Sequence, residues 1–309
     1  MRYLIYISVS IYLSSTLSIT AQTPHVSTGT IRHFDNFPSA YIGRRTVDVW
    51  LPDGYTSKKR YPVLYMFDGM SLFDSSIMWN RQTWGVADVL GDLLLKKKIR
   101  DCIVVGIWNG GASRHSEYFP QKPFESLPPR IQDSLYQVTR GGALLFSERI
   151  QSDNYLRFLV REVKPFIDSA FSTWHDSANT FVLGSSMGGL MAWYAICEYP
   201  DVFGGAACLS THWPGVFTFN DNPIPAAFFN YLHTHLPAPG HHKIYFDFGT
   251  RTLDSVYQPL QERVDEEMKI NGYHSDNWET RKFPGADHSE RAWHERLAIP
   301  VIFLLGLQR

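Results

Sequence analysis

A serine stands at the centre of a Gly-x-Ser-x-Gly pattern, Gly184-Ser-Ser-Met-Gly188. An apolar run at 180–183 precedes the pattern and a second one at 190–198 follows it, which is the strand–turn–helix setting of a nucleophile elbow. Such a turn forces its central residue into an uncommon backbone conformation, and the glycines let the chain pass close to itself. The central residue, Ser186, is the candidate nucleophile. An ordinary glycine-rich connection is the alternative.

A serine hydroxyl is a weak nucleophile at neutral pH, so it needs a base, and the base needs an acid to orient it. His288 follows the last expected strand and is the candidate base, whereas His294 is expected on a helix surface. Asp254 leaves the strand expected at 243–248 through a turn and is the candidate acid, although it could also cap the helix after it. Asp247 is the alternative acid, but it falls inside that strand.

An oxyanion formed during acyl transfer needs two backbone N–H donors. The first is expected from Met187, directly after the candidate nucleophile. The second is expected from Met70, in the loop after the strand at 61–67, because Gly69 lets the chain turn there. An ordinary turn at Asp68-Gly69 is the alternative.

The elements expected to position these residues are short apolar runs alternating with amphipathic stretches, which is typical of βαβ units around a mostly parallel sheet. Strands are predicted at 45–51, 61–67, 103–108, 180–183, 204–209, 243–248 and 278–283. Helices are predicted at 84–98, 153–171, 190–198, 226–235, 256–271 and 289–305, with a kink at Pro165. The weakly periodic segment 112–150 is predicted to be a lid or binding wall. We expect one α/β domain over 22–309.

Composition excludes several classes of protein. The 309 residues carry 29 Lys and Arg against 30 Asp and Glu, so the net charge of −1 gives no electrostatic footprint for nucleic-acid binding. Hydrophobic residues make up 44% and charged residues 19%, which is a globular composition and excludes wholesale disorder.

The N-terminal segment 1–21 predicts a secretory signal peptide. Arg2 precedes an apolar stretch of suitable length, and small and polar residues follow up to a cleavage site near Ala21. The stretch is short and interrupted for a membrane span, although an uncleaved anchor is the alternative. The mature protein is expected to be secreted or periplasmic, with no membrane association.

The cysteines and histidines outside the candidate triad do not form a metal pattern. Cys102 and Cys208 lie in apolar runs and are expected to be buried thiols, and no Cys-x-x-Cys pair occurs. A metal site at the clustered histidines is the alternative, but they lack a carboxylate at ligand spacing and are expected on the surface: His233, His235, His241 and His242. We therefore expect neither a metal nor another cofactor.

With these motifs in order along the chain, roughly residues 28–306 resemble the Putative esterase family of α/β hydrolases. That family includes enterochelin-type siderophore esterases, feruloyl and acetyl-xylan esterases, S-formylglutathione hydrolases and mycolyltransferases. The motifs that carry the resemblance are Val47-Asp-Val-Trp-Leu-Pro-Asp-Gly-Tyr55, Tyr65-Met-Phe-Asp-Gly69, Gly184-Ser-Ser-Met-Gly-Gly189, Asp247-Phe-Gly-Thr-Arg-Thr-Leu-Asp254 and Gly285-Ala-Asp-His-Ser-Glu290.

The resemblance implies a single-domain α/β-hydrolase fold with helices on both faces of the sheet, and it supports the roles given to the triad and the oxyanion donors. The segment from Trp108 to Tyr118 is similar to the family's segment bordering the substrate cleft. Cleft candidates are Trp108, Arg114, His212 and Trp213. A pair between Arg114 and Glu117, and a core position for Trp213, are the alternatives.

The sequence therefore predicts an exported serine esterase that acts on a small-molecule or glycan-linked ester, such as a carbohydrate-linked acyl ester or a siderophore-like ester. Acyl transfer by the same triad is one alternative. A non-catalytic glycan-binding module that uses the 15% of aromatic residues is another. The sequence leaves the ester and the oligomeric state open.

Overall fold

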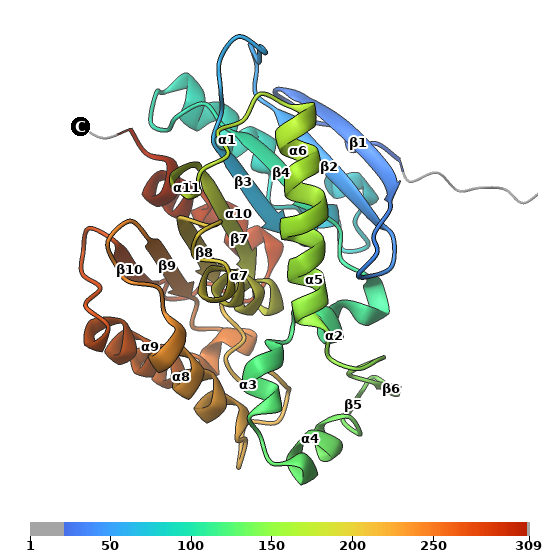
Figure 1. The fold of residues 1–309 in the computed structure, drawn as a ribbon, viewed down its shortest axis with the longest axis vertical. Helices are drawn as coiled ribbons and strands as arrows, with labels where there is room; N and C mark the ends of the chain where they lie inside the picture. Colours follow the sequence, from blue (N-terminus) through green and yellow to red (C-terminus); the bar gives the residue numbers. More distant parts are fainter. Residues whose placement is uncertain (1–21, 308–309) are drawn as a thin grey trace, which may run out of the picture.

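The computed structural model describes residues 22–307, and a single eight-stranded sheet organises them (Figure 1). The sheet has the order β1-β2-β4-β3-β7-β8-β9-β10. Its strands are β1 (Thr30–Phe37), β2 (Arg45–Leu51), β3 (Val63–Phe67), β4 (Ile103–Ile107), β7 (Thr180–Ser185), β8 (Gly205–Leu209), β9 (Lys243–Phe248) and β10 (Trp278–Lys282). β2 is antiparallel to both β1 and β4, and the pairings from β4 to β10 are parallel. The predicted α/β-hydrolase fold is confirmed.

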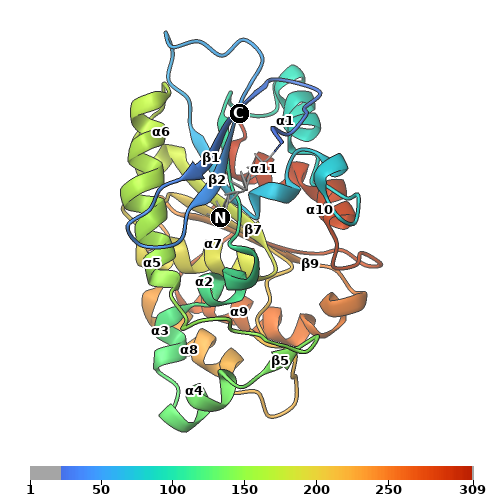
Figure 2. The ribbon, with the colours of Figure 1, turned by 90° about the vertical axis from the view of Figure 1, so that its right-hand side faces the viewer.

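Helices cover both faces of the sheet (Figure 2). On one face lie α5 (Ser152–Phe158), α6 (Lys164–Ala170), α7 (Met187–Glu198), α8 (Ile224–His235) and α9 (Gln258–Ile270). On the other lie α1 (Val86–Leu95), α10 (Glu290–Arg296) and α11 (Ala298–Leu305). Because the central strands are buried on both sides, β3, β4, β7 and β8 are buried at every position. The strands therefore read as continuous apolar runs in the sequence.

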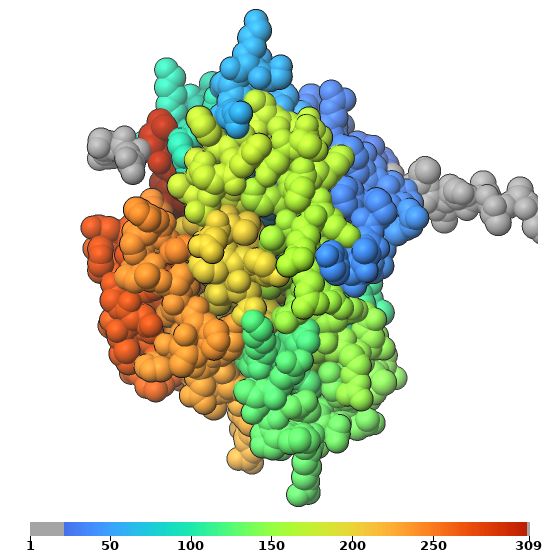
Figure 3. Space-filling view, in the orientation of Figure 1, coloured from blue at the N-terminus to red at the C-terminus, as the bar shows by residue number. Residues whose placement is uncertain are grey.

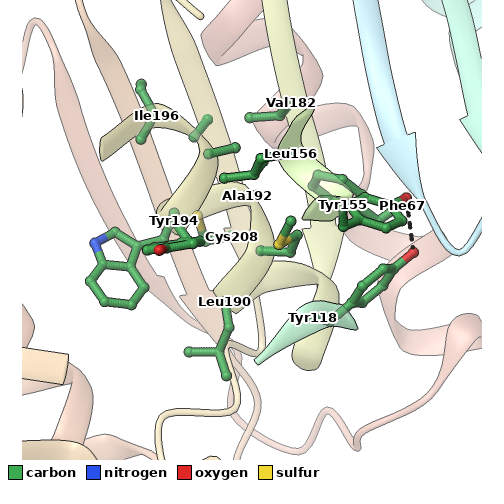
Figure 4. Packing of buried hydrophobic residues seen from close by; sticks show 14 of the residues in the cluster. Phe67, Tyr118, Tyr155, Leu156, Val182, Leu190, Ala192, Tyr194, Ile196 and Cys208 are labelled. Carbon is green, nitrogen blue, oxygen red and sulfur yellow. Dashed lines mark hydrogen bonds between the residues drawn. The ribbon is translucent and has the colours of Figure 1, made fainter. Parts of the chain in front are cut away.

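The core on the α7 face is rich in aromatic rings (Figure 4). Phe67, at the end of β3, meets the rings of Tyr118 and Tyr155 at centroid distances of 5.6 and 6.0 Å, and the two tyrosine hydroxyls lie 3.4 Å apart. A buried aromatic hydroxyl requires a polar partner, which these tyrosines supply to each other. This cluster fixes the end of β3, from which the loop with Met70 departs.

The segment 112–150 is more regular than predicted. It contains α2 (Arg114–Tyr118), α3 (Gln121–Glu125), α4 (Pro129–Leu135) and a small hairpin of β5 (Thr139–Arg140) and β6 (Ala143–Leu144). In Figure 3 this segment forms the green lower part of the molecule beside the orange α8, and α3 packs on α8. The hydrophobic periodicity of this segment is weak because each of its helices is short and only partly buried.

Two other elements differ from the prediction. β1 was not predicted, because its sequence is mostly polar and none of its residues is fully buried at this edge of the sheet. The helix expected at 153–171 is split by a π-helical segment, Leu159–Val163, directly before Pro165. The irregularity lies there because proline cannot donate the backbone hydrogen bond that would continue the helix.

The sequence also predicts a signal peptide at the N-terminus and buried thiols. The proposed signal peptide lies outside the described residues. Among residues 22–307, no helix has the length and hydropathy needed to cross a bilayer. All three cysteines are buried free thiols: Cys102, Cys197 and Cys208.

Acid is expected to destabilise the fold through His115, which α2 buries among Phe119 and Phe146. Burial lowers the pKa of His115 to about 3, while the unfolded chain takes up this proton near pH 6.5. The contribution of His115 is therefore complete above pH 6.5 and falls by up to about 1.4 kcal/mol per pH unit down to pH 3.

The variant His115→Gln should weaken this dependence of stability on pH, because glutamine takes up no proton. Its amide can still donate to the Gly215 carbonyl that the Nε2 atom of His115 contacts at 2.9 Å. The measurement is the urea midpoint between pH 7 and pH 4. The exposed His241→Gln serves as the control, with an unchanged profile expected. If the urea midpoint fell equally steeply with pH in His115→Gln and in the parent protein, His115 would take up its proton in the folded state, and the prediction would be wrong.

Candidate active site

The turn between β7 and α7 presents one residue to solvent. Every residue in 180–197 is buried except Ser186, whose backbone has φ 56° and ψ −119°. This conformation is strained for a residue with a side chain, and such strain concentrates at functional sites. A Cβ atom on Gly184 would lie 2.5 Å from the carbonyl oxygen of Gly188, so the turn requires glycine at position 184.

An imidazole and a carboxylate meet beyond the carboxyl end of β9. The Nδ1 atom of His288 lies 2.5 Å from Oδ1 of Asp254, whose side chain is fully buried, while the imidazole is 14% exposed. The other carboxylate oxygen, Oδ2, accepts hydrogen bonds from the Gly249 N–H and the Ser210 hydroxyl, both at 2.6 Å. Asp254 therefore orients the imidazole and does not cap a helix; α9 begins four residues later.

The loops that carry these two residues are joined along their backbones. The N–H groups of Thr250 and Arg251 both donate to the Ala286 carbonyl at 3.0 Å, and the His288 N–H donates to the Thr252 hydroxyl at 2.9 Å. A Cβ on Gly249 would lie 2.3 Å from the Ala286 oxygen, so only glycine permits this approach. The candidate base is thus held by the loop of the candidate acid.

The segment after β8 connects the candidate acid with the candidate nucleophile. Ser186 donates its backbone N–H to Leu209 at 2.9 Å, and its carbonyl accepts from His212 at 3.2 Å. Between these two residues, Ser210 contacts Asp254 through its side chain. The nucleophile candidate and the acid are therefore held by one four-residue segment, 209–212.

The Ser210 hydroxyl has one proton, and its contacts determine where that proton lies. It accepts hydrogen bonds from Trp293 Nε1 at 3.0 Å and Arg296 Nη2 at 2.8 Å, and both of those groups can only donate. The proton must therefore point to Asp254. The guanidinium of Arg296 also binds both carboxylate oxygens of Asp247, at 2.9 and 3.1 Å. Asp247, the alternative acid, is thus fully buried in an ion pair away from the imidazole.

We expect Ser210→Ala to lower kcat by roughly 10–100-fold with little change in KM. A hydrogen bond to a charged group contributes about 1.5–3 kcal/mol, and each 1.4 kcal/mol corresponds to a factor of ten. Trp293→Phe is the matched comparison, since it removes one donor to Ser210 but leaves the bond to Asp254, and it should cost only a few-fold. Steady-state kinetics on both variants tests this ordering, and a larger kcat loss in Trp293→Phe would contradict it.

The loop after β3 lies beside the elbow. Asp68 has φ 56°, and a Cβ on Gly69 would lie 2.6 Å from the Gly106 backbone, so the loop turns tightly against β4. Met70 is the second residue of the short helical turn Gly69–Ser71, and Met187 is the first residue of α7. The first N–H groups of a helix have no partner inside it, as an oxyanion donor requires. The two methionines remain predicted donors.

Asp68 is clamped by the segment after β4. Arg114 donates to both carboxylate oxygens at 2.7 Å, and Asn109 Nδ2 donates to Oδ1 at 2.6 Å. The expected pair between Arg114 and Glu117 is therefore wrong, because Glu117 points to the other side and binds Arg45. Residues three apart on a helix can pair, but here Arg114 binds Asp68 and Glu117 binds Arg45, so the two residues do not pair with each other.

Two of the three remaining cleft candidates are fully buried. Trp213 is fully buried and donates to Gln261 at 2.9 Å, so it belongs to the core and not to the cleft mouth. Trp108 is directed to β2, where its Nε1 donates to Asp48 at 2.6 Å. His212 is also fully buried, but its ring lies next to the site, 6.0 Å from Tyr257. Tyr257 in turn packs against His288 at 5.9 Å.

Two other features lie away from these residues. His294, expected on a helix surface, is half-buried and contacts the Trp84 carbonyl at 2.9 Å. A hollow of about 760 Å³ lies at the amino ends of β7, β8 and β9, opposite the elbow. His241 and His242 line it, whereas His233 contacts Glu267 on α9.

The profile of one protein family matches residues 39–304, and its description is "Putative esterase". This match spans most of the sequence and includes every residue of the candidate active site. The chain belongs to this family. It is accordingly a carboxylic ester hydrolase.

The chain is also similar to individual proteins. Uncharacterized protein YbbA from Bacillus subtilis (strain 168) is 22% identical over 86% of this chain and 95% of its own length. A second protein of that organism, Uncharacterized protein YjcH, is 22% identical over 57% of this chain and 59% of its own length.

Solved structures share the fold at low sequence identity. A ferulic acid esterase has a TM-score of 0.63 at 18% identity, over 89% of this chain and 98% of its own. An IroE-like serine hydrolase from Shewanella oneidensis has the same TM-score and identity, over 89% and 78% of the two chains. The enterobactin esterase FES from Shigella flexneri has a TM-score of 0.63 at 17% identity, over 92% and 60%.

Proposed function

We propose that the chain is a serine esterase in which Ser186, His288 and Asp254 form the catalytic triad. The observation that carries the proposal is the buried Asp254 carboxylate 2.5 Å from His288 Nδ1, together with the strained and partly exposed Ser186. Asp254 accepts a hydrogen bond from the Nδ1–H group, which keeps the proton on Nδ1 and leaves Nε2 of His288 free to take the proton of the serine hydroxyl.

The reaction then follows in two halves. Ser186 Oγ attacks the ester carbonyl as its proton moves to His288, and the backbone N–H groups of Met70 and Met187 stabilise the oxyanion. The imidazolium returns the proton to the departing alcohol, which leaves an acyl-enzyme. Water, deprotonated by His288, attacks the acyl carbon, and the acid is released as Ser186 regains its proton.

The substrate that we propose is a carbohydrate-linked acyl ester or a siderophore-like ester. The support comes from the structural relatives, which include a ferulic acid esterase and an enterobactin esterase. Acyl transfer to an alcohol would use the same first half-reaction.

Export of the protein is part of the proposal and rests on the sequence of residues 1–21. N-terminal sequencing of the protein recovered outside the cytoplasm should show a chain that begins directly after Ala21. A mature chain that still contains Met1 and Arg2 would contradict it.

An ester panel tests the proposed activity. The substrates are 4-nitrophenyl acetate and butyrate, methyl ferulate, acetylated xylan and a catecholate siderophore, each with and without glycerol as an acceptor. We expect release of the free acid from at least one ester. If folded protein releases the alcohol from none of these esters, the proposal is contradicted. If a glycerol ester is the main product, acyl transfer is favoured over hydrolysis.

A further inference from the structure

His212 holds a polar atom that the triad does not use. The side chain is fully buried, and its Nε2 atom has no hydrogen-bond partner among residues 22–307. The residue belongs to the segment that contacts the nucleophile, since its N–H donates to the Ser186 carbonyl. An unpaired buried polar group costs about 1–3 kcal/mol, so its presence beside a reactive serine requires a reason.

The proton on this ring can be assigned from its other nitrogen. Nδ1 lies 2.7 Å from the Tyr257 hydroxyl, which is itself buried and has no other hydrogen-bond partner within the described part of the chain. If Nδ1 donated, the hydroxyl proton of Tyr257 would be left without an acceptor. The arrangement that satisfies both groups has Tyr257 donating to Nδ1, so that the proton of the neutral ring is on Nε2.

The surroundings keep the ring neutral. Burial lowers the pKa of His212 well below its usual value, and the neighbouring charges of Arg114 and Arg140 lower it further. Arg114 also clamps the predicted oxyanion loop, and Tyr257 packs on both His212 and His288, so the His212 ring is a neighbour of both the clamp and the candidate base. The nearby cations disfavour a second proton, and the ring can offer one N–H donor only.

An aromatic side chain packs on the face of the His212 ring. Phe217 is half-buried and lies over the imidazole, with ring centroids 5.0 Å apart and planes tilted by 32°. Arg140, on the exposed hairpin strand β5, lies 3.6 Å from the Phe217 centroid. An acyl group that took the place of this ring would pack on the same imidazole, a surface that suits a flat, partly apolar group.

We propose that His212 is a specificity-determining residue whose Nε2–H group donates to an oxygen atom of the substrate's acyl group. This inference rests on the proposed serine esterase activity. It assigns a preference for acyl groups that carry a hydroxyl, ether or carbonyl oxygen beyond the ester, compared with hydrocarbon acyl groups of similar size. A site built to hydrogen-bond a substrate rejects analogues without the polar atom, because its own donor is then left unpaired.

Matched substrates and variants test this assignment. The substrate pairs are methyl 4-hydroxycinnamate with methyl cinnamate, and 4-nitrophenyl methoxyacetate with 4-nitrophenyl butyrate. In His212→Gln the amide can occupy the place of Nε2 and still donate, whereas in His212→Asn it can replace only the Nδ1 contact with Tyr257. Labelling of Ser186 by a fluorophosphonate verifies that each variant keeps a working site.

The parent enzyme should favour the oxygen-bearing member of at least one pair by tenfold or more in kcat/KM. His212→Gln should keep most of that preference, and His212→Asn should reduce it to within about twofold. A preference that survives in His212→Asn, or a parent enzyme that hydrolyses both members of each pair equally, overturns the inference. If His212→Asn does not fold, the inference is tested by the preference of the parent enzyme and by whether His212→Gln keeps most of it. Absence of hydrolysis in every pair would instead contradict the serine esterase proposal.

Discussion

Replacing Ser186 with alanine is expected to lower kcat/KM for every ester that the enzyme hydrolyses by at least about 10⁴-fold. The reason is that the strained turn exposes this one hydroxyl among residues 180–197, so no neighbouring group can replace it. The fold should remain, because alanine removes only a partly exposed oxygen. The measurement is kcat/KM on the best substrate of the ester panel.

Ser185→Ala is the matched control for this experiment. Ser185 is the last residue of β7 and is buried, so its replacement makes a similar chemical change one position away. We expect its kcat/KM to stay within tenfold of the parent value. Retained activity in Ser186→Ala, or an equal loss in both variants, would exclude Ser186 as the nucleophile.

The second large effect is expected for Asp254→Asn, which should lower kcat by roughly 10⁴-fold while leaving KM nearly unchanged. Oδ2 accepts from the Gly249 N–H and from the Ser210 hydroxyl, whose proton cannot turn away because Trp293 and Arg296 occupy its acceptor sites. The amide oxygen of asparagine must therefore take this position, and its NH₂ group must face His288.

An NH₂ group at that place requires His288 Nδ1 to accept, which puts the imidazole proton on Nε2, where it cannot receive the serine proton. Steady-state kinetics between pH 6 and pH 9 measures the loss. Asp247→Asn is the comparison, because it breaks a buried ion pair and should lower the free energy of unfolding by about 3–5 kcal/mol. A greater kcat loss in Asp247→Asn than in Asp254→Asn would reverse the two assignments.

Local patterns in the sequence were sufficient for the elements around the elbow. β7, α7 and the turn between them form from one continuous stretch, and the requirement for Gly184 follows from the turn itself. The strand β9 has the predicted bounds, Lys243–Phe248, because its two buried faces give an uninterrupted apolar run apart from Asp247. The fold class could be predicted for the same reason, since buried parallel strands and the helices between them have distinct patterns.

The contacts between distant segments could not be read from the sequence. Ser210 gains its role only where α10 brings Trp293 and Arg296 against the end of β8. Arg114 was expected to pair with Glu117 because they are close in sequence, whereas Asp68, 46 positions away, is its partner. Trp213 was placed at the cleft because a tryptophan suits either a cleft or a core, and only packing on Trp193 distinguishes them.

A fluorophosphonate probe tests the central claim most directly, because it reacts with a serine only where a base activates it. The folded parent protein is treated with the probe, and the modified peptide is mapped by mass spectrometry. We predict a single adduct on Ser186, and no adduct in His288→Ala, whose fold is verified by circular dichroism. Folded parent protein that stays unlabelled, or that carries the adduct on another serine, would contradict a triad of Ser186, His288 and Asp254.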